Sequence, residues 1–225
     1  RCVRRWPCWA RWRFWICKMA IFDDIGATMS HPLLQSYAET LQQTFPLILV
    51  IGREPNTNLP ISDQHGQYNF DDYPRCAFWN ISYSTVAATV QLTAAELKSH
   101  CRKQRGSPIL YADALPIGLK HSVADKHGQR ARLEAHAIRD HIAAVFAYRP
   151  LLDRVGLVIV SGLEAAVFEP ARSAIAIQCD NQRIPHYQLP FFFGNNAPRI
   201  RVAMTGELRD RLQATMLTFT QLAQT

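Results

Sequence analysis

Three apolar runs in the chain each end in residues that could do chemistry. Residues 47–52 lead into the sequence Gly-Arg-Glu-Pro-Asn at 52–56, a second run ends at Asp113, and a third ends at Ser161 and Gly162. A carboxylate can stabilise a developing positive charge or orient water. A glycine lets the backbone approach a ligand closely. Ligands of parallel α/β sheets bind beyond the carboxyl ends of the strands, so these three ends predict one shared site.

The elements that must position these residues follow from the hydrophobic pattern. Short apolar or β-branched runs predict strands at 47–52, 76–83, 107–116, 155–162, 173–178 and 199–204. Helical spacing predicts helices from Ser30 to Pro46, from a capping box at Thr93 and Glu96 to Lys103, over 130–148, directly after Gly162, and from Glu207 to Leu222. Alternating strands and helices predict an α/β fold of three layers, in which helices cover both faces of a central, mainly parallel sheet.

Length and composition limit the class of protein. The chain has 225 residues, of which 48% are hydrophobic and 19% are charged. These values suit one globular domain and exclude collagen, a long coiled coil and a wholly disordered chain. No apolar run reaches the roughly 20 residues of a membrane-spanning helix, so we expect no membrane contact. We assign residues 19–225 to a single α/β domain.

The first 18 residues differ from the rest of the chain. They carry six positive charges, no acidic residue and four of the five tryptophans. A tryptophan at every third position would suit a basic amphipathic helix on a membrane surface or on nucleic acid. We interpret residues 1–18 instead as a non-core tail, either upstream sequence read ahead of Met19 or an extension unrelated to the fold. Without this tail the formal charge of +7 falls to about +1, so the pI of 9.3 is not a nucleic-acid footprint of the domain.

Cysteine and histidine spacing argues against a disulfide framework and against a metal site. Cys76, Cys101 and Cys179 are widely separated, and we interpret each as a small buried hydrophobe. Four histidines are not spaced as ligand pairs one turn apart on a helix, namely His121, His127, His136 and His141. We therefore predict no metal and no cofactor, and a cytoplasmic location for a monomer.

Taken in order, the strand-end motifs resemble those of the uracil-DNA glycosylase superfamily, and look closest to its single-strand-selective and mismatch-specific branches. That family has a G-x-[DEN]-P loop after its first strand, an Asn that reads the base after a middle strand, and a G-x-x-A helix start after a late strand. This chain has Gly-x-Glu-Pro at 52–55, Asp113 followed by Pro116, and Ser-Gly-x-x-Ala at 161–165. The resemblance covers about residues 31–220 and implies the family's α/β/α fold, with nucleic acid, most simply DNA, as the partner.

The resemblance also implies a division of roles. Glu54 and Asn56 take the catalytic position, where a carboxylate meets the oxocarbenium character of the sugar. The base pocket is formed by Gly52, Pro55, Phe78, Asp113, Asn195 and Asn196. The nucleic-acid backbone is met by Ser161, Gly162, Arg199 and Arg201. Aromatic faces on which a base could stack are offered by Tyr68, Phe70, Phe78 and Trp79.

Two departures from the family bear on the chemistry. Asp113 stands where the family has Asn, and an ionised Asp only accepts hydrogen bonds, so it suits a base with two N–H groups. The segment 190–206 contains no His, although the family places one before its final helix to stabilise the leaving base.

The resemblance and its departures leave two candidate functions. One is a nucleobase N-glycosylase that hydrolyses the bond to a damaged or deaminated base. The other is a catalytically inactive module of the same fold that binds nucleic acid, a nucleotide or a protein partner.

Each of these residues also has a purely structural interpretation. Glu54 could be an ordinary surface carboxylate, and Asp113 could cap the turn before Pro116. Ser161 and Gly162 could form only a tight strand-to-helix turn. The remaining alternatives are a core position for Phe191, Phe192 and Phe193, a solvated helix face for Arg130, Arg132 and Arg139, and a protein-binding role for the polar loop 53–75.

Overall fold

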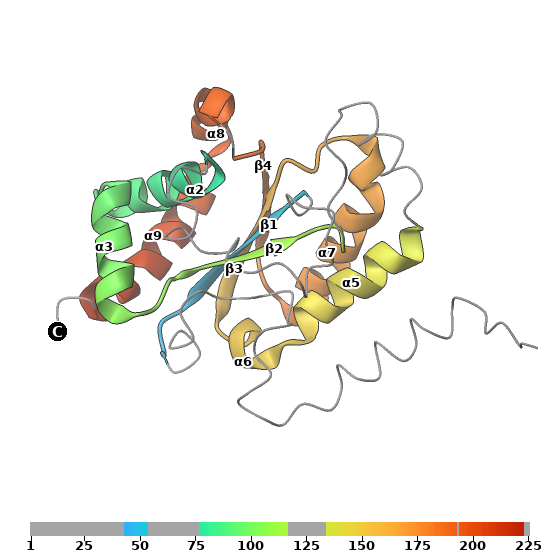
Figure 1. The fold of residues 1–225 in the computed structure, drawn as a ribbon, viewed down its shortest axis with the longest axis horizontal. Coiled ribbons are helices and arrows are strands. Elements are labelled where there is room, and N and C mark those ends of the chain that lie inside the picture. Colours follow the sequence, from blue (N-terminus) through green and yellow to red (C-terminus); the bar gives the residue numbers. More distant parts are fainter. Residues whose placement is uncertain (1–42, 54–76, 117–133, 193, 223–225) are drawn as a thin grey trace, which may run out of the picture.

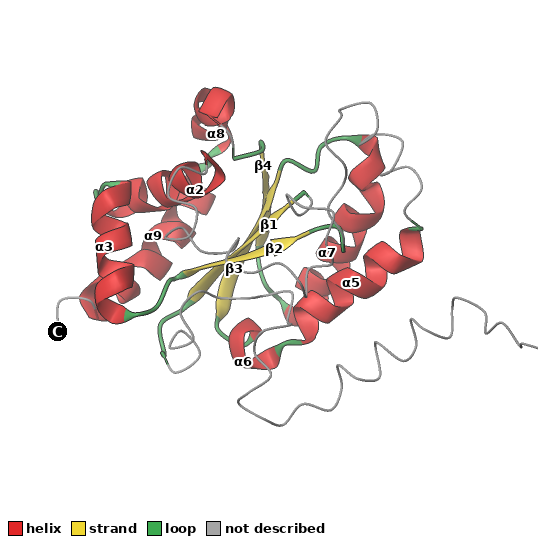
Figure 2. Ribbon diagram, in the orientation of Figure 1, coloured by secondary structure: helices red, strands yellow, loops and turns green. Residues whose placement is uncertain are grey.

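The computed structural model describes residues 43–53, 77–116, 134–192 and 194–222. Its centre is a sheet of four parallel strands in the order β2-β1-β3-β4 (Figures 1 and 2). The strands are β1 (Leu47–Gly52), β2 (Ile109–Asp113), β3 (Val155–Ser161) and β4 (His186–Leu189).

Helices cover both faces of this sheet, which confirms the predicted three-layer α/β/α fold (Figure 1). One face carries α2 (Ala77–Ala87), α3 (Ala94–Gln104) and α9 (Gly206–Leu222). The other carries α5 (Ala135–Ala147), α6 (Arg149–Leu152) and α7 (Glu169–Gln182). The short helix α8 (Ala197–Ala203) follows β4, and three 3-10 turns lie between these elements, namely η4 (Ala88–Val90), η5 (Ala166–Phe168) and η6 (Gly194–Asn196).

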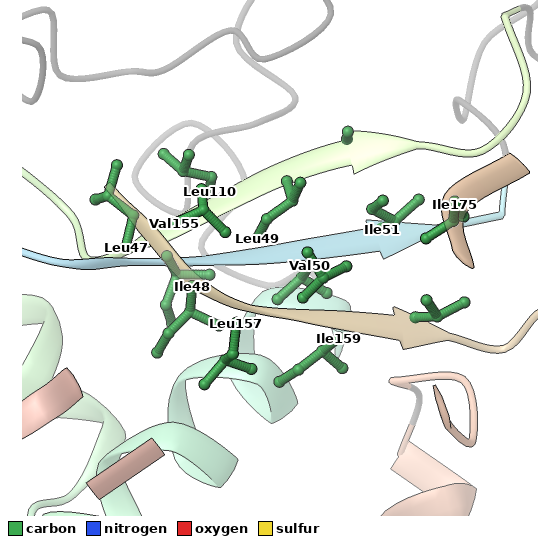
Figure 3. Close-up of a cluster of buried hydrophobic side chains, with 14 of the residues drawn as sticks. Leu47, Ile48, Leu49, Val50, Ile51, Leu110, Val155, Leu157, Ile159 and Ile175 are labelled. Atoms are coloured by element: carbon green, nitrogen blue, oxygen red, sulfur yellow. The ribbon is translucent and has the colours of Figure 1, made fainter. Parts of the chain in front are cut away.

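Strand β1 lies at the centre of the core, which explains its unbroken apolar sequence. All its residues are buried, because β2 and β3 flank it and helices cover both of its faces. Figure 3 shows Ile48 and Val50 pointing to one face of the sheet, and Leu49 and Ile51 to the other. A strand covered on both faces loses the alternation of polar and apolar residues, so a short continuous apolar run is its sequence signature.

Several predicted elements are confirmed. Strands occur within 47–52, 107–116 and 155–162, and α5 lies within the predicted helix 130–148. The capping box of α3 is present, because the Thr93 hydroxyl accepts from the Glu96 amide at 3.2 Å and the Glu96 carboxylate accepts from the Thr93 amide at 2.7 Å. Helix α9 buries the four predicted side chains, Leu208, Leu212, Met216 and Phe219. Cys101 and Cys179 are buried free thiols, as predicted, and burial raises the pKa of Cys179 to about 12.

Three predicted strands are helices in the structure. Residues 76–83 fall largely in α2, 173–178 in α7 and 199–204 largely in α8. In α2 the buried positions include Trp79, Tyr83 and Val86, which follow the three- and four-residue spacing of one helix face. Pro170 and Pro198 stand in the first turns of α7 and α8, a position that favours helix initiation. These segments were predicted as strands because they are rich in aromatic and β-branched residues. The spacing of the buried residues, not the composition, determines whether a segment is a helix or a strand.

Strand β4 was not predicted, because its buried pattern is weak. Only Leu189 is buried among its four residues, as expected at the edge of a sheet. The tail 1–18 and the start of the predicted helix from Ser30 lie outside the described residues, and residues 43–46 are not helical. Among the described helices, none is both long enough and apolar enough to cross a membrane.

Candidate functional site

Parallel pairing brings three of the predicted strand ends to one edge of the sheet. Gly52 is in register with Asp113, and Ile51 is in register with Val160, so that Gly52 lies beside the end of β3. The Ala114 amide donates to the Gly52 carbonyl at 2.9 Å. Gly52, Asp113 and Gly162 therefore lie at the same edge, as the sequence predicts. The predicted partners from the loop after β1 lie outside the described residues and stay predictions: Glu54, Pro55, Asn56, Tyr68 and Phe70.

The neighbouring strands β1 and β3 send the chain to opposite faces of the sheet. The next described helix after β1 is α2, on the face that also carries α3, whereas β3 is followed by α7 on the other face (Figure 1). Two adjacent parallel strands whose connections part in this way leave a crevice at their carboxyl ends, and ligands of open α/β sheets bind there. In the order β2-β1-β3-β4 the chain moves from β1 to β2 on one side and to β3 and β4 on the other, so this rule puts the expected ligand crevice between β1 and β3, next to Gly52 and Gly162.

Tyr111 fills the space next to Gly52. Its hydroxyl donates a hydrogen bond to Oδ1 of Asp113. Asp113 is buried, with only 1% of its surface exposed. A Cβ atom on Gly52 would lie 2.4 Å from the Tyr111 hydroxyl oxygen, which no real Cβ could do. In this conformation the missing side chain of Gly52 therefore makes room for Tyr111. The prediction from the sequence was that it makes room for a ligand. Asp113 is buried and bonded to an aromatic residue of its own strand, so it is not an exposed loop carboxylate.

His141 reaches the same strand end from α5. Its Nε2 lies 2.8 Å from the backbone carbonyl oxygen of Asp113. A carbonyl only accepts, so Nε2 carries the proton and Nδ1 is left as an acceptor. Removal of water by the surrounding protein lowers the pKa of His141 to about 4, so the imidazole is neutral at pH 7. Sequence spacing did not link this residue to Asp113, because the two lie 28 positions apart and histidine was considered only as a metal ligand and in the segment 190–206. The described part of the chain contains no cluster of three or more possible metal ligands.

Aromatic side chains form one wall beside Asp113. The Phe78 ring centre lies 4.7 Å from that of Tyr111, 6.4 Å from that of Phe191 and 5.8 Å from that of Phe192. Phe78 is partly exposed, whereas Trp79 and Phe192 are core residues. Of the two predicted stacking residues that the structure describes, Phe78 is therefore the more exposed.

Ser161 and Gly162 build a tight turn. Ser161 is completely buried, and its hydroxyl oxygen accepts from the Phe192 amide at 3.0 Å. Gly162 has φ +79°, and a Cβ there would lie 2.5 Å from the Cβ of Phe191. These contacts support the structural interpretation of this motif. In this conformation the Ser161 side chain cannot reach a phosphate.

Arg53 bridges β1 and β3 at the crevice. Its Nε donates to the Gly162 carbonyl at 2.6 Å, and its guanidinium carbon lies 4.6 Å from the centre of the Phe191 ring. Glu164 is 3.9 Å from Nη2, and the two side chains are 36% and 42% exposed. Arg53 was not among the site residues predicted from the sequence. Its position directly after an apolar strand was the available signal.

The predicted residues after β4 have contacts of their own. Asn196 donates from Nδ2 to the Phe191 carbonyl at 3.0 Å and accepts from Arg199 at 3.3 Å, so it supports the turn rather than a ligand. Asn195 and Arg199 are exposed. Arg201 lines a separate groove of about 740 Å³ between α2–η4 and α8–α9, where Arg209 joins it.

No protein-family model matches this chain, and no curated protein sequence matches it either. The interpretation of the site therefore depends on the chemistry of its own residues.

Proposed function

We propose that the protein is a nucleobase N-glycosylase-like protein that holds a base at the carboxyl end of the sheet and hydrolyses the bond between base and sugar. The observation that supports this proposal is that Asp113 is bonded to Tyr111, which forms an aromatic wall with Phe78, at the edge of the sheet that also carries Gly52 and Gly162. A planar base requires an aromatic face and a polar group at its edge, and this wall offers both.

The proposed chemistry uses few groups. The base stacks on Phe78, and the Asp113 carboxylate accepts from N–H groups at its edge. Glu54, in the loop after β1, takes a proton from a water molecule whose oxygen bonds to C1′ of the sugar. The N-glycosidic bond breaks, its electron pair leaves with the base, and solvent protonates the departing base. The carboxylate charge also stabilises the positive charge that develops on the sugar.

Tyr111 sets a condition on this mechanism. Its ring lies over Gly52 and its hydroxyl is bound to Asp113, so a base can reach that carboxylate only when the Tyr111 side chain turns away. This same observation favours the second candidate function, a non-catalytic module of the same fold. In such a module Tyr111 would stay in place, and a ligand would bind outside it.

Excision of single bases tests the first function directly. We would measure single-turnover cleavage of oligonucleotides carrying uracil, hypoxanthine or xanthine, with alkali to reveal abasic sites. Glu54→Gln should lower excision of every base, because it removes the charge that meets the oxocarbenium ion. Asp113→Asn should raise activity on uracil, because Asn can donate to a uracil carbonyl and a carboxylate cannot. Asp140→Asn, an exposed carboxylate on α5, is the matched control and should change nothing.

Two results would contradict this proposal. Parent protein that cuts uracil well, with no change in Asp113→Asn, would show that Asp113 does not read the base. Folded protein that cuts no base in any variant, yet binds a single-stranded oligonucleotide, would establish the non-catalytic module instead.

A further inference from the structure

The Arg53 side chain is held rigidly at the crevice between β1 and β3. The hydrogen bond from Nε to the Gly162 carbonyl fixes one edge of the guanidinium, and the Phe191 ring at 4.6 Å supports one of its faces. An arginine that is already immobilised loses less conformational freedom when it binds a ligand. Arg53 is nevertheless 36% exposed, so solvent and ligands can reach it.

The outward edge of this guanidinium is available. Neither Nη1 nor Nη2 of Arg53 donates a hydrogen bond to any residue that the structure describes, and the Glu164 carboxylate stands 3.9 Å from Nη2, beyond hydrogen-bond distance. Two parallel N–H groups on a planar cation match two oxygens of an oxyanion. A weak, exposed ion pair such as that with Glu164 contributes little and is readily replaced.

The neighbouring helix offers no competing anion site. The first turn of α7 holds Glu169, whose charge would repel an anion. Arg172 forms an ion pair with Glu169, and its Nη1 donates to the carbonyls of Leu163 and Ala165, so that this arginine closes the loop after Gly162. Among the residues described here, Arg53 is therefore the cation at this edge whose Nη groups donate no hydrogen bond.

We propose that Arg53 is the phosphate-binding residue of this crevice, and that Nη1 and Nη2 bind two oxygens of a phosphate group on the ligand. The Phe191 ring that supports Arg53 also lies 6.4 Å from the Phe78 ring, centre to centre. A ligand held at Arg53 by its phosphate can thus extend over the aromatic wall, which fits a nucleotide unit better than a simple carboxylate. The nucleotide part of this inference depends on the proposed function, whereas the phosphate contact does not.

Binding measurements test this assignment without any excision. The probes are inorganic phosphate, a deoxynucleoside 5′-monophosphate and a single-stranded oligonucleotide, each titrated by calorimetry against folded protein at low salt. Arg53→Lys should weaken binding of all three by about tenfold or more, because Lys keeps the charge but loses both the anchor and the paired donors. Glu164→Gln should strengthen binding a few-fold, because it removes a competing carboxylate. Arg139→Gln, which removes an exposed charge from α5, should bind as the parent does.

The variants also separate this role from a purely structural one. If Arg53 only clamps β1 to β3, Arg53→Lys lowers the melting temperature while the affinity of the folded protein for phosphate stays unchanged, which would overturn the proposal. Absence of phosphate binding by the parent, or weaker binding by Glu164→Gln, would overturn it as well. Equal affinity for inorganic phosphate and nucleotide would remove the nucleotide part alone. Phosphate binding that depends on Arg53, in a protein that excises no base, would uphold the Arg53 site and reject the glycosylase.

Discussion

The two ends of the sheet each hold an arginine over a phenylalanine, and the two pairs differ in what surrounds them. At the amino end, Arg154 lies over Phe45 at 5.8 Å, donates from Nη1 to the Gln43 carbonyl, and has a buried Nε. Desolvation lowers its pKa. At the carboxyl end, Arg53 lies over Phe191 at 4.6 Å, and its side chain is 36% exposed. The same pair of residue types thus closes the core at one end and presents a cation at the other.

Other polar groups also differ between the two ends of the sheet. At the amino end, Tyr83 and Ser107 form a buried hydroxyl pair at 2.7 Å, and Gln104 donates to the Phe219 carbonyl at 3.4 Å. At the carboxyl end, the buried Ser161 hydroxyl is joined by two titratable groups, namely the buried Asp113 and the partly buried imidazole of His141. Neutral hydrogen bonds between partners of fixed position stabilise a fold, whereas buried titratable groups cost stability, and two of them at one sheet edge mark a candidate site.

The largest expected effect compares two glycines at opposite ends of β3. Gly162→Ala should cost about 3 kcal/mol or more, because φ is +79° and the new Cβ would meet Phe191 at 2.5 Å. Gly156→Ala should be neutral or stabilise by up to about 1 kcal/mol, because its Cβ would meet Thr215 at an ordinary 3.6 Å and glycine weakens a strand. Urea unfolding measures both. Equal costs would show that the turn after β3 is not strained against Phe191.

The next effect is a pH dependence confined to the carboxyl end. The pKa of His141 is lowered to about 4 in the folded protein, from 6.5 when unfolded, so the folded state binds fewer protons in this range. The contribution of neutral His141 to the free energy of unfolding is fully present above pH 6.5. It is lost as the pH falls from 6.5 to 4, by up to about 3 kcal/mol. His141→Gln keeps a side-chain donor for the Asp113 carbonyl and does not titrate. The free energy of unfolding of the parent should therefore fall more steeply over this window than that of the variant. Parallel curves would mean that His141 is hydrated and titrates normally.

Replacing the arginine at each end of the sheet should have a smaller effect on stability. Arg154→Met should cost about 2 kcal/mol, because it keeps the packing of the stem but leaves the Gln43 carbonyl without this donor in a partly buried place. Arg53→Met should cost about 1 kcal/mol or less, because water can replace the donor to the Gly162 carbonyl. Thermal unfolding of both variants at one pH makes the comparison. A larger loss for Arg53→Met would identify Arg53 as a structural clamp.

Sequence patterns predicted the layers of the fold and the edge that carries the candidate site, for physical reasons that can be named. Continuous apolar runs such as 47–52 indicate central strands, and parallel pairing then aligns their carboxyl ends. The patterns missed α2 and the part of α7 around Ile175. Trp79 and Tyr83 in α2, and Ile175 in α7, have side chains typical of strands although each lies on the buried face of a helix. They also missed Tyr111 over Gly52 and His141 at Asp113, because those contacts depend on tertiary packing that no local spacing records.

The smallest expected effect compares two tyrosine hydroxyls, one at each end. Tyr83→Phe should cost about 1 kcal/mol, the usual value for a hydrogen bond between neutral groups. Tyr111→Phe should cost about 2 kcal/mol, because its hydroxyl donates to a buried carboxylate and such bonds are stronger. The difference of about 1 kcal/mol is measurable by urea unfolding when both variants keep the parent's m-value. If Tyr111→Phe costs less than Tyr83→Phe, the Asp113 carboxylate is satisfied by other donors, and the Tyr111 ring is then freer to turn away from Gly52. That result would strengthen the base-binding role of Asp113, whereas a cost well above 2 kcal/mol would mean that Tyr111 is fixed in place and would favour the non-catalytic module.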